Sequence, residues 1–339
     1  MSAEPQEAPA PVSQQRIPDF FIVGHAKCGT TALYEMLRRH PQIYLPEYKG
    51  GAGKEPWYFS RDNPQPQTTP ERSVAFTGRR AMSLDEYLAL FAGARPEQRI
   101  GEASTSYLWS RTAAARIAEA QPAARIVAIL REPASFLRSL HLQLLQNHHE
   151  VEPDFRKAVA LDDARREGRQ IPANSYWPQA LIYSDRVRYV EQLRRYHAAF
   201  PPEQVLVLIY DDFRRDNEGT VRTVQRFLGV DDTVPMDVVA ANPTIGVRSV
   251  AIDKFVRTLR GGQGPVSGAA KATIKTLTPW KLRDRVFYPL RSRIVYGQPP
   301  PPDQSFTSEL QRRFKPEVVA LSEYLGRDLV TLWGYDGLG

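Results

Sequence analysis

The sequence lacks the features that mark secreted, disulfide-bonded or membrane-embedded proteins. Its single cysteine, Cys28, excludes intramolecular disulfides and any metal site built from several cysteines. No run of about 18 or more apolar residues occurs, so no membrane-spanning helix is predicted. Residues 1–15 are acidic and proline-rich without an apolar core, unlike a secretory signal. We expect a cytoplasmic bacterial protein with a disordered tail over residues 1–17 and one domain over residues 18–339.

Positive charge is concentrated toward the C-terminal part of the chain. The 339 residues carry a formal net charge of +7, yet residues 248–293 alone hold eleven Lys and Arg against two Asp, a balance of +9. Such a segment is typical of a solvated face, of a site for an anionic cofactor, or of peripheral contact with an anionic membrane surface, here the inner face of the membrane. No nucleic-acid-binding motif accompanies the charge, so nucleic acid is not an expected partner.

Short apolar runs alternate with helical segments along the chain. The runs at 20–24, 125–130 and 205–210 are typical of buried parallel strands, and a weaker one surrounds Ile100. This alternation predicts an α/β protein, a P-loop-like three-layer fold with a central parallel sheet flanked by helices, in which ligands bind at the carboxyl ends of the strands. Helices are predicted at 32–39, 84–91 (opened by a capping box of Ser83 and Glu86), 134–148, 180–197 and 314–335, mobile loops at about 61–80 and 260–305, and a stiff linker at 297–304.

The segment 24–31 follows a predicted strand and begins a predicted helix. Backbone N–H groups in such a turn converge on one point, and phosphate is the natural ligand there. The pattern of nucleotide triphosphatases, G-x-x-x-x-G-K-[ST], is nearly met, but Thr30 stands in the place of its lysine and Lys27 precedes Gly29 instead. A phosphatase of the Cys-x5-Arg type is excluded because Tyr34 occupies the arginine position. The segment therefore predicts a phosphate site of a different class.

The stretch Lys27 to Leu33 resembles the 5′-phosphosulfate loop of sulfotransferases that use 3′-phosphoadenosine 5′-phosphosulfate (PAPS). Family members usually have a proline before the lysine, where this chain has Ala26. The resemblance implies that Lys27 contacts the bridging and sulfuryl oxygens of PAPS. It assigns the 5′-phosphate to Gly29, Thr30 and Thr31, and it counts Cys28 and Ala32 among the cofactor-binding positions of the loop.

Two further segments resemble parts of the same family's nucleotide site. Arg131 and Ser139, at the end of a predicted strand and on the next helix, are similar to the 3′-phosphate motif, in which an arginine fork and a helical hydroxyl hold the phosphate. Tyr210, followed by two aspartates, resembles a family tyrosine near the adenine, although a buried tyrosine at a strand end is as typical of a core. Arg248 is a further candidate for the 3′-phosphate from its position and charge.

The candidate base is Glu55. The stretch 54–60 resembles the Lys-Glu-x-x-Phe-Phe segment of heparan sulfate and related carbohydrate sulfotransferases, and the resemblance implies that Glu55 takes the proton of the acceptor hydroxyl. A surface Glu55 paired with Lys54 is the alternative interpretation. Cytosolic small-molecule sulfotransferases use a histidine instead. The histidines considered for that role are His141, His148 and His149.

Residues 101–108 also resemble a family segment, which usually reads Gly-Glu-Lys-Thr-Pro-x-Tyr. Ala103 stands here in the place of the family lysine and Thr105 in the place of its proline, so a second cationic helper at this point is not supported. Glu102 is either structural or assists the acceptor. Residues 314–333 match the closing helix of bacterial members.

Together these residues predict an enzyme that transfers a sulfuryl group from PAPS to a hydroxyl of a glycan, glycolipid or small natural product and releases 3′,5′-adenosine bisphosphate. No metal is expected. Two alternatives stay open: a P-loop kinase that uses ATP and magnesium, and a nucleotide-binding protein at a membrane surface without transfer activity. The aromatic residues that either stack on the acceptor or pack in the core are Trp57, Tyr58, Trp109, Trp177 and Trp280.

Overall fold

The computed structural model describes residues 16–47, 54–60, 82–147, 149–172, 175, 178–235, 246–247, 296–297 and 301–337. The predicted mobile loop 61–80, most of the loop 260–305 and the basic segment 248–293 lie outside these residues, as do residues 1–15 of the predicted tail. The remaining tail residues already contact the domain, because Arg16 donates a hydrogen bond to the Pro96 carbonyl oxygen and Ile17 packs against the core.

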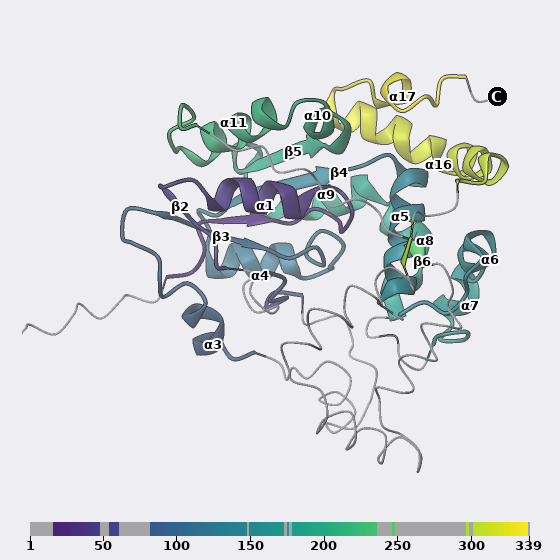
Figure 1. The fold of residues 1–339 in the computed structure, drawn as a ribbon, viewed down its shortest axis with the longest axis horizontal. Helices are drawn as coiled ribbons and strands as arrows, with labels where there is room; N and C mark the ends of the chain where they lie inside the picture. Colours follow the sequence, from purple (N-terminus) through teal and green to yellow (C-terminus); the bar gives the residue numbers. More distant parts are fainter. Residues whose placement is uncertain are drawn as a thin grey trace, which may run out of the picture.

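A five-stranded sheet, in which every neighbouring pair is parallel, forms the centre of the domain and confirms the predicted architecture (Figure 1). The strand order is β2-β3-β1-β4-β5, so β1 lies in the middle with Phe21 opposite both Glu102 of β3 and Ile126 of β4. Every residue of β1 is fully buried, as expected for a strand with helices on both faces. The strands are β1 (Phe20–Ile22), β2 (Ile43–Tyr44), β3 (Arg99–Ala103), β4 (Arg125–Leu130) and β5 (Val205–Ile209), with a separate antiparallel pair of β6 (Gly246–Val247) and β7 (Tyr296–Gly297).

Helices cover both faces of the sheet (Figure 1). α1 packs against α11 on one face, and α4 packs against α9 on the other, as right-handed crossovers between parallel strands require. None of the helices in the described ranges is long and apolar enough to cross a bilayer. The helices are α1 (Thr30–Arg38), α3 (Leu84–Ala89), α4 (Ala113–Ala120), α5 (Pro133–Gln146), α6 (Phe155–Ala160), α7 (Asp162–Arg166), α8 (Tyr183–Arg186), α9 (Tyr189–Ala199), α10 (Tyr210–Arg215), α11 (Asn217–Leu228), α16 (Gln304–Leu325) and α17 (Leu329–Leu332), with 3₁₀ turns η1 (Pro178–Leu181) and η2 (Pro202–Gln204).

The predicted continuous helix at 180–197 is wrong, because the segment is divided into η1, α8 and α9. Side chains from other elements accept hydrogen bonds from the first backbone N–H groups of the new helices and so stabilise the breaks. The carboxylate of Asp162 accepts from the N–H groups of Tyr183 and Ser184, and that of Glu317 accepts from Val190.

The predicted closing helix at 314–335 is also revised. α16 begins ten residues earlier, at Gln304, where Asp303 caps it through the N–H of Phe306, and it ends at Gly326 in the left-handed conformation (φ 60°). A short α17 then follows. The strand around Ile100, predicted to be short and weak, is the five-residue β3 inside the sheet. The capping box of Ser83 and Glu86 is confirmed at the start of α3.

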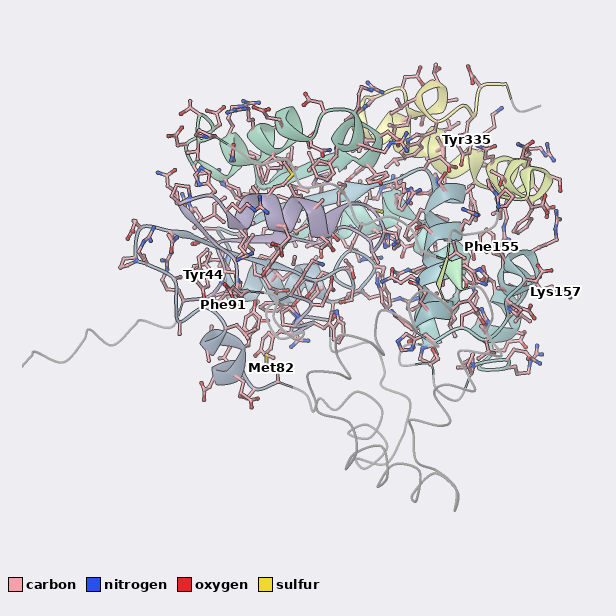
Figure 2. The ribbon with its side chains drawn as sticks, viewed as in Figure 1. Tyr44, Met82, Phe91, Phe155, Lys157 and Tyr335 are labelled. Atoms are coloured by element: carbon pink, nitrogen blue, oxygen red, sulfur yellow. The ribbon has the colours of Figure 1, made fainter. Side chains whose placement is uncertain are left out.

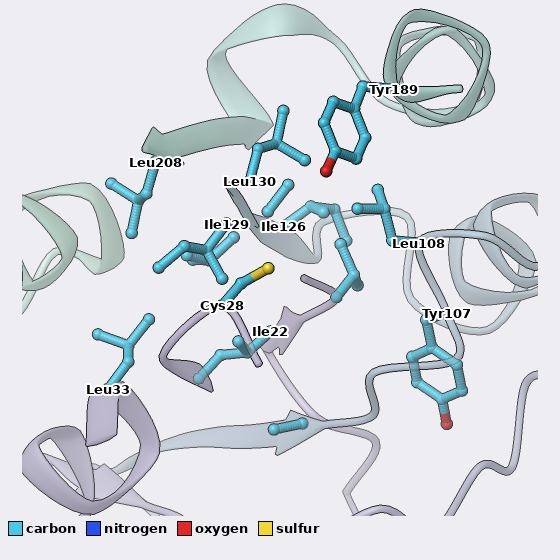
Figure 3. Packing of buried hydrophobic residues seen from close by; sticks show 14 of the residues in the cluster. Ile22, Cys28, Leu33, Tyr107, Leu108, Ile126, Ile129, Leu130, Tyr189 and Leu208 are labelled. Carbon is cyan, nitrogen blue, oxygen red and sulfur yellow. The ribbon is translucent and has the colours of Figure 1, made fainter. Parts of the chain in front are cut away.

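The core lies on both sides of the sheet and includes the single cysteine. Figure 3 shows the Cys28 sulfur beside Ile22 and near Ile126 and Ile129, and burial raises the pKa of this thiol to about 12. Cys28 is therefore a neutral core residue at neutral pH. Its side chain has no role in nucleophilic chemistry. The core extends from one end of the molecule to the other. Figure 2 labels Tyr44 and Phe91 near one end, and Phe155 and Lys157 of α6 near the other.

Candidate active site

A cavity of about 420 Å³ lies at the carboxyl ends of the parallel strands and collects most of the predicted site residues. Its walls come from the loop after β1, the segment around Glu55, the turn after β3, the end of β4, helix α5 and the region around α8. The lining residues are Ala26, Lys27, Gly29, Thr30, Thr31, Ala32, Lys54, Glu55, Trp57, Thr105, Ser106, Trp109, Arg131, Leu140, Gln143, Leu144, Asn147, His149, Ala180, Arg186 and Tyr210.

The loop between β1 and α1 is shaped to receive an anion. α1 begins after Gly29 without a side-chain cap and without an acidic residue in its first turn, so its N-terminal N–H groups lack a side-chain acceptor beside the cavity. Gly29 has φ 87°, and a Cβ atom there would lie 2.9 Å from the Phe213 ring. Lys27 also occupies the left-handed region, with φ 66°. A glycine is thus required for the turn, and the positive helix terminus fits the phosphate predicted from the sequence.

Arg131, at the end of β4, couples the two predicted phosphate motifs. Its Nη1 donates a hydrogen bond to the Lys27 carbonyl oxygen at 3.0 Å, and its guanidinium lies 4.9 Å from the centre of the Tyr210 ring. Burial lowers the pKa of Lys27, and the positive charge of Arg131 lowers it further. The cavity therefore holds two close cations, an arrangement that favours a polyanionic ligand.

The C-terminal segment supports this wall of the cavity from behind. Arg327 forms an ion pair with Asp212 at 2.5 Å, and Trp333 Nε1 donates to Asp211 Oδ2 at 3.0 Å, so the helix that begins at Tyr210 is held at two adjacent positions. Tyr335 donates its hydroxyl to Glu132, whose carboxylate also accepts the first N–H groups of α5. Residues after 325 thereby fix the ends of β4 and β5.

Glu55 lies on a second wall of the cavity, formed by its own segment, and four hydrogen-bond donors hold its carboxylate. Lys54 Nζ contacts Oε1 at 2.7 Å. Oε2 accepts from Trp57 Nε1 at 2.9 Å, from the N–H of Thr105 at 2.8 Å and from the Thr105 hydroxyl at 3.0 Å. The predicted pair with Lys54 therefore exists, but Lys54 is only 5% exposed and both residues line the cavity, so the pair is not a surface feature.

A buried network beneath this wall supports the strained backbone of Glu55 and Trp57, whose φ values are 60° and 55°. Glu102 is fully buried and accepts hydrogen bonds from the hydroxyls of Ser104, Tyr87 and Tyr107. Ser104 in turn accepts the N–H of Trp57 at 3.1 Å. Desolvation raises the pKa of Glu102 to about 7. Glu102 does not line the cavity and has a structural role, one of the two interpretations left open by the sequence.

The other predicted site residues have different positions. Ser139 is buried on α5 beside the cavity lining rather than within it. Arg248 lies outside the described residues. Cys28 has its side chain in the core. Among the described residues, no group of three or more His, Cys, Asp or Glu side chains is arranged to hold a metal ion.

Some of the candidate histidines and aromatic residues line the cavity, and others do not. His141 is buried against Phe155, and its Nε2 lies 2.8 Å from the Glu152 carbonyl oxygen, whereas His149 lines the cavity. His148, Trp177 and Trp280 lie outside the described residues. Trp57 and Trp109 line the cavity. Tyr58 packs in the core instead, stacked on Tyr87 at 4.3 Å.

Comparison with known proteins agrees with this geometry. A model of the sulfotransferase family matches residues 18–234, which is more than half of the chain and includes the loop after β1, Glu55, Arg131 and Tyr210. The chain belongs to the sulfotransferase family. The α16 and α17 helices lie outside the matched range.

Among individual sulfotransferases, the chain is 25% identical over 258 residues to mouse carbohydrate sulfotransferase 15, covering 63% of this chain and 44% of the relative. It is 26% identical over 240 residues to human heparan sulfate glucosamine 3-O-sulfotransferase 3B1, covering 68% of this chain and 52% of the relative. The chain thus spans about half the length of these curated relatives. A solved sulfotransferase from Alicyclobacillus acidocaldarius is 27% identical with a TM-score of 0.64, covering 94% of this chain and 99% of the other.

Sequence reasoning missed two residues of this sulfotransferase site. In the sequence, Thr105 stands out only as a departure from the family pattern, yet it supplies two of the four donors to Glu55. The sequence places Arg186 in a continuous helix, yet it lines the cavity with only 4% of its surface exposed. Neither has a signal in the sequence, because each lies about 50 or more residues from the group it approaches and only the fold brings them together.

Proposed function

We propose that this sulfotransferase transfers a sulfuryl group from PAPS to a hydroxyl group of a carbohydrate or related acceptor. PAPS supplies the activated sulfuryl group, and 3′,5′-adenosine bisphosphate is released. The single observation that carries the proposal is that Lys27 and Glu55 line one cavity together with an uncapped helix N-terminus and Arg131. Carbohydrate acceptors are favoured by the relatives named for carbohydrate and heparan sulfate sulfation.

On the nucleotide side, the first turn of α1 offers backbone N–H groups and the hydroxyls of Thr30 and Thr31 to the 5′-phosphate. Arg131 is assigned to the 3′-phosphate, since its guanidinium is planar and presents several donors. The assignment of Ser139 to the same phosphate rests on its spacing from Arg131, and that of Arg248 on its charge. Tyr210 provides an aromatic surface beside Arg131 for the base.

Lys27 is the cation that offsets negative charge as it grows on the bridging oxygen of the donor. The left-handed conformation of Lys27, together with the hydrogen bond from Arg131 to its carbonyl oxygen, fixes the start of the side chain before the reaction begins. A preorganised charge of this kind needs no rearrangement in the transition state. It is therefore a larger catalytic contribution than the same charge on a mobile side chain.

Glu55 is the base that takes the proton from the acceptor hydroxyl. Its Oε2 already accepts three hydrogen bonds, whereas Oε1 accepts one, from Lys54. A carboxylate oxygen has about two lone-pair sites, so Oε1 is the atom with capacity for the incoming proton. The three bonds to Oε2 orient the carboxylate toward the cavity.

The first test is calorimetric titration with 3′,5′-adenosine bisphosphate, with ATP plus magnesium and 5′-AMP as comparators. We expect the bisphosphate to bind at least about tenfold more tightly than either comparator, since it alone carries phosphates at both positions. Binding of ATP only, and only with magnesium, would instead assign the protein to the kinases.

The catalytic step is tested separately with Glu55→Gln, which keeps the shape of the side chain and removes its basicity. We expect the transfer rate to fall by about 10²–10⁴-fold while the affinity for 3′,5′-adenosine bisphosphate stays within about twofold. The matched control is Glu203→Gln, an exposed position on η2, which should retain full activity. Loss of nucleotide binding with unchanged chemistry would contradict the assigned role.

A further inference from the structure

Arg186, the last residue of α8, is a buried cation without a carboxylate partner among the described residues. It is 4% exposed and lines the cavity, yet its Nε and Nη1 atoms have no hydrogen-bond partner in the part of the chain that the structure describes. The neighbouring carboxylate, Asp185, forms an ion pair with Arg166 instead. The guanidinium of Arg186 lies 4.2 Å from the Trp109 ring centre, a cation–π contact that is favourable for its charge.

A hydrogen-bond relay holds Arg186 in this position. Gln192 Nε2 donates to the carbonyl oxygens of Asp185 and Arg186, so its Oε1 is turned toward His25 Nε2 at 2.8 Å. A guanidinium can only donate, so the 3.3 Å contact of Arg186 Nη2 with His25 Nδ1 requires a neutral His25 with its proton on Nε2. Burial and the charge of Arg186 lower the pKa of His25, consistent with that neutral form.

The contact with His25 uses Nη2 of Arg186, and Nε and Nη1 remain available to donate to another group. Burial lowers the pKa of Arg186 to about 9, because desolvation outweighs the opposing influence of Tyr189, Cys28 and Asp185. An uncompensated guanidinium in a protein interior is destabilising, and such groups persist where a ligand completes them. The missing partner of Arg186 is therefore an anion that enters the cavity.

The position of Arg186 identifies where that anion lies. Its side chain contacts His25, in the loop that carries Lys27, and Trp109, in the segment that begins with Thr105 and so with the donors to Glu55. It thus joins the two segments between which donor and acceptor must meet. The α5 residues Leu140, Gln143 and Leu144, which line the same cavity, are uncharged.

We propose that Arg186 binds an oxyanion at the junction of donor and acceptor, with Nε and Nη1 as donors and with His25 and Gln192 as positioning residues. The oxyanion is either the sulfonate of the donor or an acid group of the acceptor. This assignment rests on the proposed function, in which both molecules share the cavity. The first turn of α1 and Arg131 are assigned to the phosphates and Lys27 to the bridging oxygen, so the role of Arg186 is separable from binding of the bisphosphate.

The test compares Arg186→Met and Arg186→Lys with Arg188→Met, a control that removes an exposed arginine two residues away. Calorimetry measures the affinity for 3′,5′-adenosine bisphosphate, then for PAPS, and then for glucuronate against glucose in the presence of the bisphosphate. For Arg186→Met we expect the bisphosphate affinity to stay within about threefold and an oxyanion affinity to fall about tenfold or more. Arg186→Lys should recover part of the loss, because it keeps the charge without the fork.

The two sources of the oxyanion give different results. A loss confined to PAPS identifies the sulfonate, whereas a loss confined to glucuronate, with PAPS and glucose unaffected, identifies an acid group of the acceptor. Equal affinities of Arg186→Met and wild type for every ligand would overturn the proposal. If the wild-type protein fails to bind the bisphosphate, the proposed function itself is wrong, and the two failures are thereby distinguished.

Thermal unfolding separates a binding role from a structural one. Removal of an unpaired buried charge should not destabilise the ligand-free protein, so we expect the melting temperature of ligand-free Arg186→Met to equal or exceed that of wild type. The rise in melting temperature produced by PAPS or glucuronate should be smaller in the variant than in wild type. A melting temperature lower by about 4 °C or more, with a parallel loss of bisphosphate affinity, would mark Arg186 as a structural residue and contradict the proposal.

Discussion

Thr105 donates two hydrogen bonds to the same oxygen of Glu55, one from its backbone N–H at 2.8 Å and one from its hydroxyl at 3.0 Å. Both donors belong to the turn that follows β3, so the central sheet itself sets the position of the candidate base. The Glu55 N–H donates in return to the carbonyl oxygen of Ala103, the last residue of β3. The segment of Glu55 is thus attached to the carboxyl end of β3, because it both accepts hydrogen bonds from Thr105 and donates one to Ala103.

We therefore expect Thr105→Val to lower kcat about tenfold. The change removes the hydroxyl donor and keeps the side-chain shape, and a hydrogen bond to a charged group is worth about 1.5–3 kcal/mol. The control is Thr112→Val, since the buried Thr112 hydroxyl has no hydrogen-bond partner among the described residues and its loss should leave kcat unchanged. Steady-state kinetics at saturating PAPS measure both. Equal kcat values for Thr105→Val and wild type would contradict the positioning role.

Lys27→Met should reduce kcat by at least about 10²-fold, because the side chain is the cation nearest the proposed bridging oxygen. The affinity for 3′,5′-adenosine bisphosphate should change far less, since backbone donors and Arg131 remain. Lys157→Met, on the exposed surface of α6, is the control and should behave as wild type. A fully active Lys27→Met variant would remove the residue from the mechanism.

The pH dependence of the free enzyme should also reveal Lys27. Burial and the charge of Arg131 lower its pKa from the usual value of 10.5. The cation is the active form, so activity is lost as the pH rises through the lowered pKa. We expect kcat/KM for PAPS to decline on the alkaline side before pH 10.5, and Lys27→Met to lack this limb. An alkaline limb that persists in the variant would belong to another group.

Glu102 should make the protein less stable as the pH rises from about 4.5 to 7. Burial raises its pKa from 4.5 to about 7, so between these values the folded protein holds a proton that the unfolded chain has lost. The free energy of unfolding then falls with rising pH, by up to about 3 kcal/mol, and the loss is complete above the folded-state pKa.

Chemical denaturation of Glu102→Gln tests this expectation, because glutamine stays neutral throughout. The difference in unfolding free energy between pH 5 and pH 8 should be smaller in Glu102→Gln than in wild type. Glu119→Gln, an exposed position on α4, should retain the wild-type difference. An unchanged difference in Glu102→Gln would assign the pH dependence to other carboxyl groups.

Breaking the buried ion pair of Arg165 and Glu150 should strongly lower the free energy of unfolding. Both side chains are almost fully buried, and Arg165 Nη1 lies 2.8 Å from Glu150 Oε2. Glu150 also accepts a hydrogen bond from the Tyr183 hydroxyl. Arg165→Met leaves Glu150 as a buried charge without its cation, which costs about 3–5 kcal/mol. Arg166→Met is the control, since its side chain is 40% exposed and its ion pairs are worth at most about 1 kcal/mol. Denaturant unfolding measures both variants. Equal losses of unfolding free energy in Arg165→Met and Arg166→Met would contradict the expected role of the buried ion pair.

The part of the site predicted from the sequence is the part built from contiguous motifs. Lys27 and Arg131 each follow a buried strand, and neighbouring parallel strands end at the same edge, so their proximity follows from local pattern and one topological rule. Glu55 was predicted through a resemblance rather than a pattern, and the structure brings it to the same cavity.

The remainder depends on contacts between distant segments. β2 has two residues, too short for periodicity to indicate a strand, and it forms only because β3 provides an edge. The breaks between η1, α8 and α9 depend on Asp162 and Glu317, far away in sequence. Arg186 faces the cavity because of those breaks, so no helical pattern in the sequence predicts its position.

The attachment of α10 to the C-terminal segment has a consequence for how the protein is made. Asp211 and Asp212 gain their partners, Trp333 and Arg327, only when residues 327–333 have left the ribosome. The five strands can pair earlier, since β5 ends at Ile209. The wall that carries Tyr210 is therefore completed after the sheet. Nucleotide affinity during synthesis should appear only once residues 327–333 have docked, and a nascent chain stopped near residue 320 would have the sheet without a finished binding site.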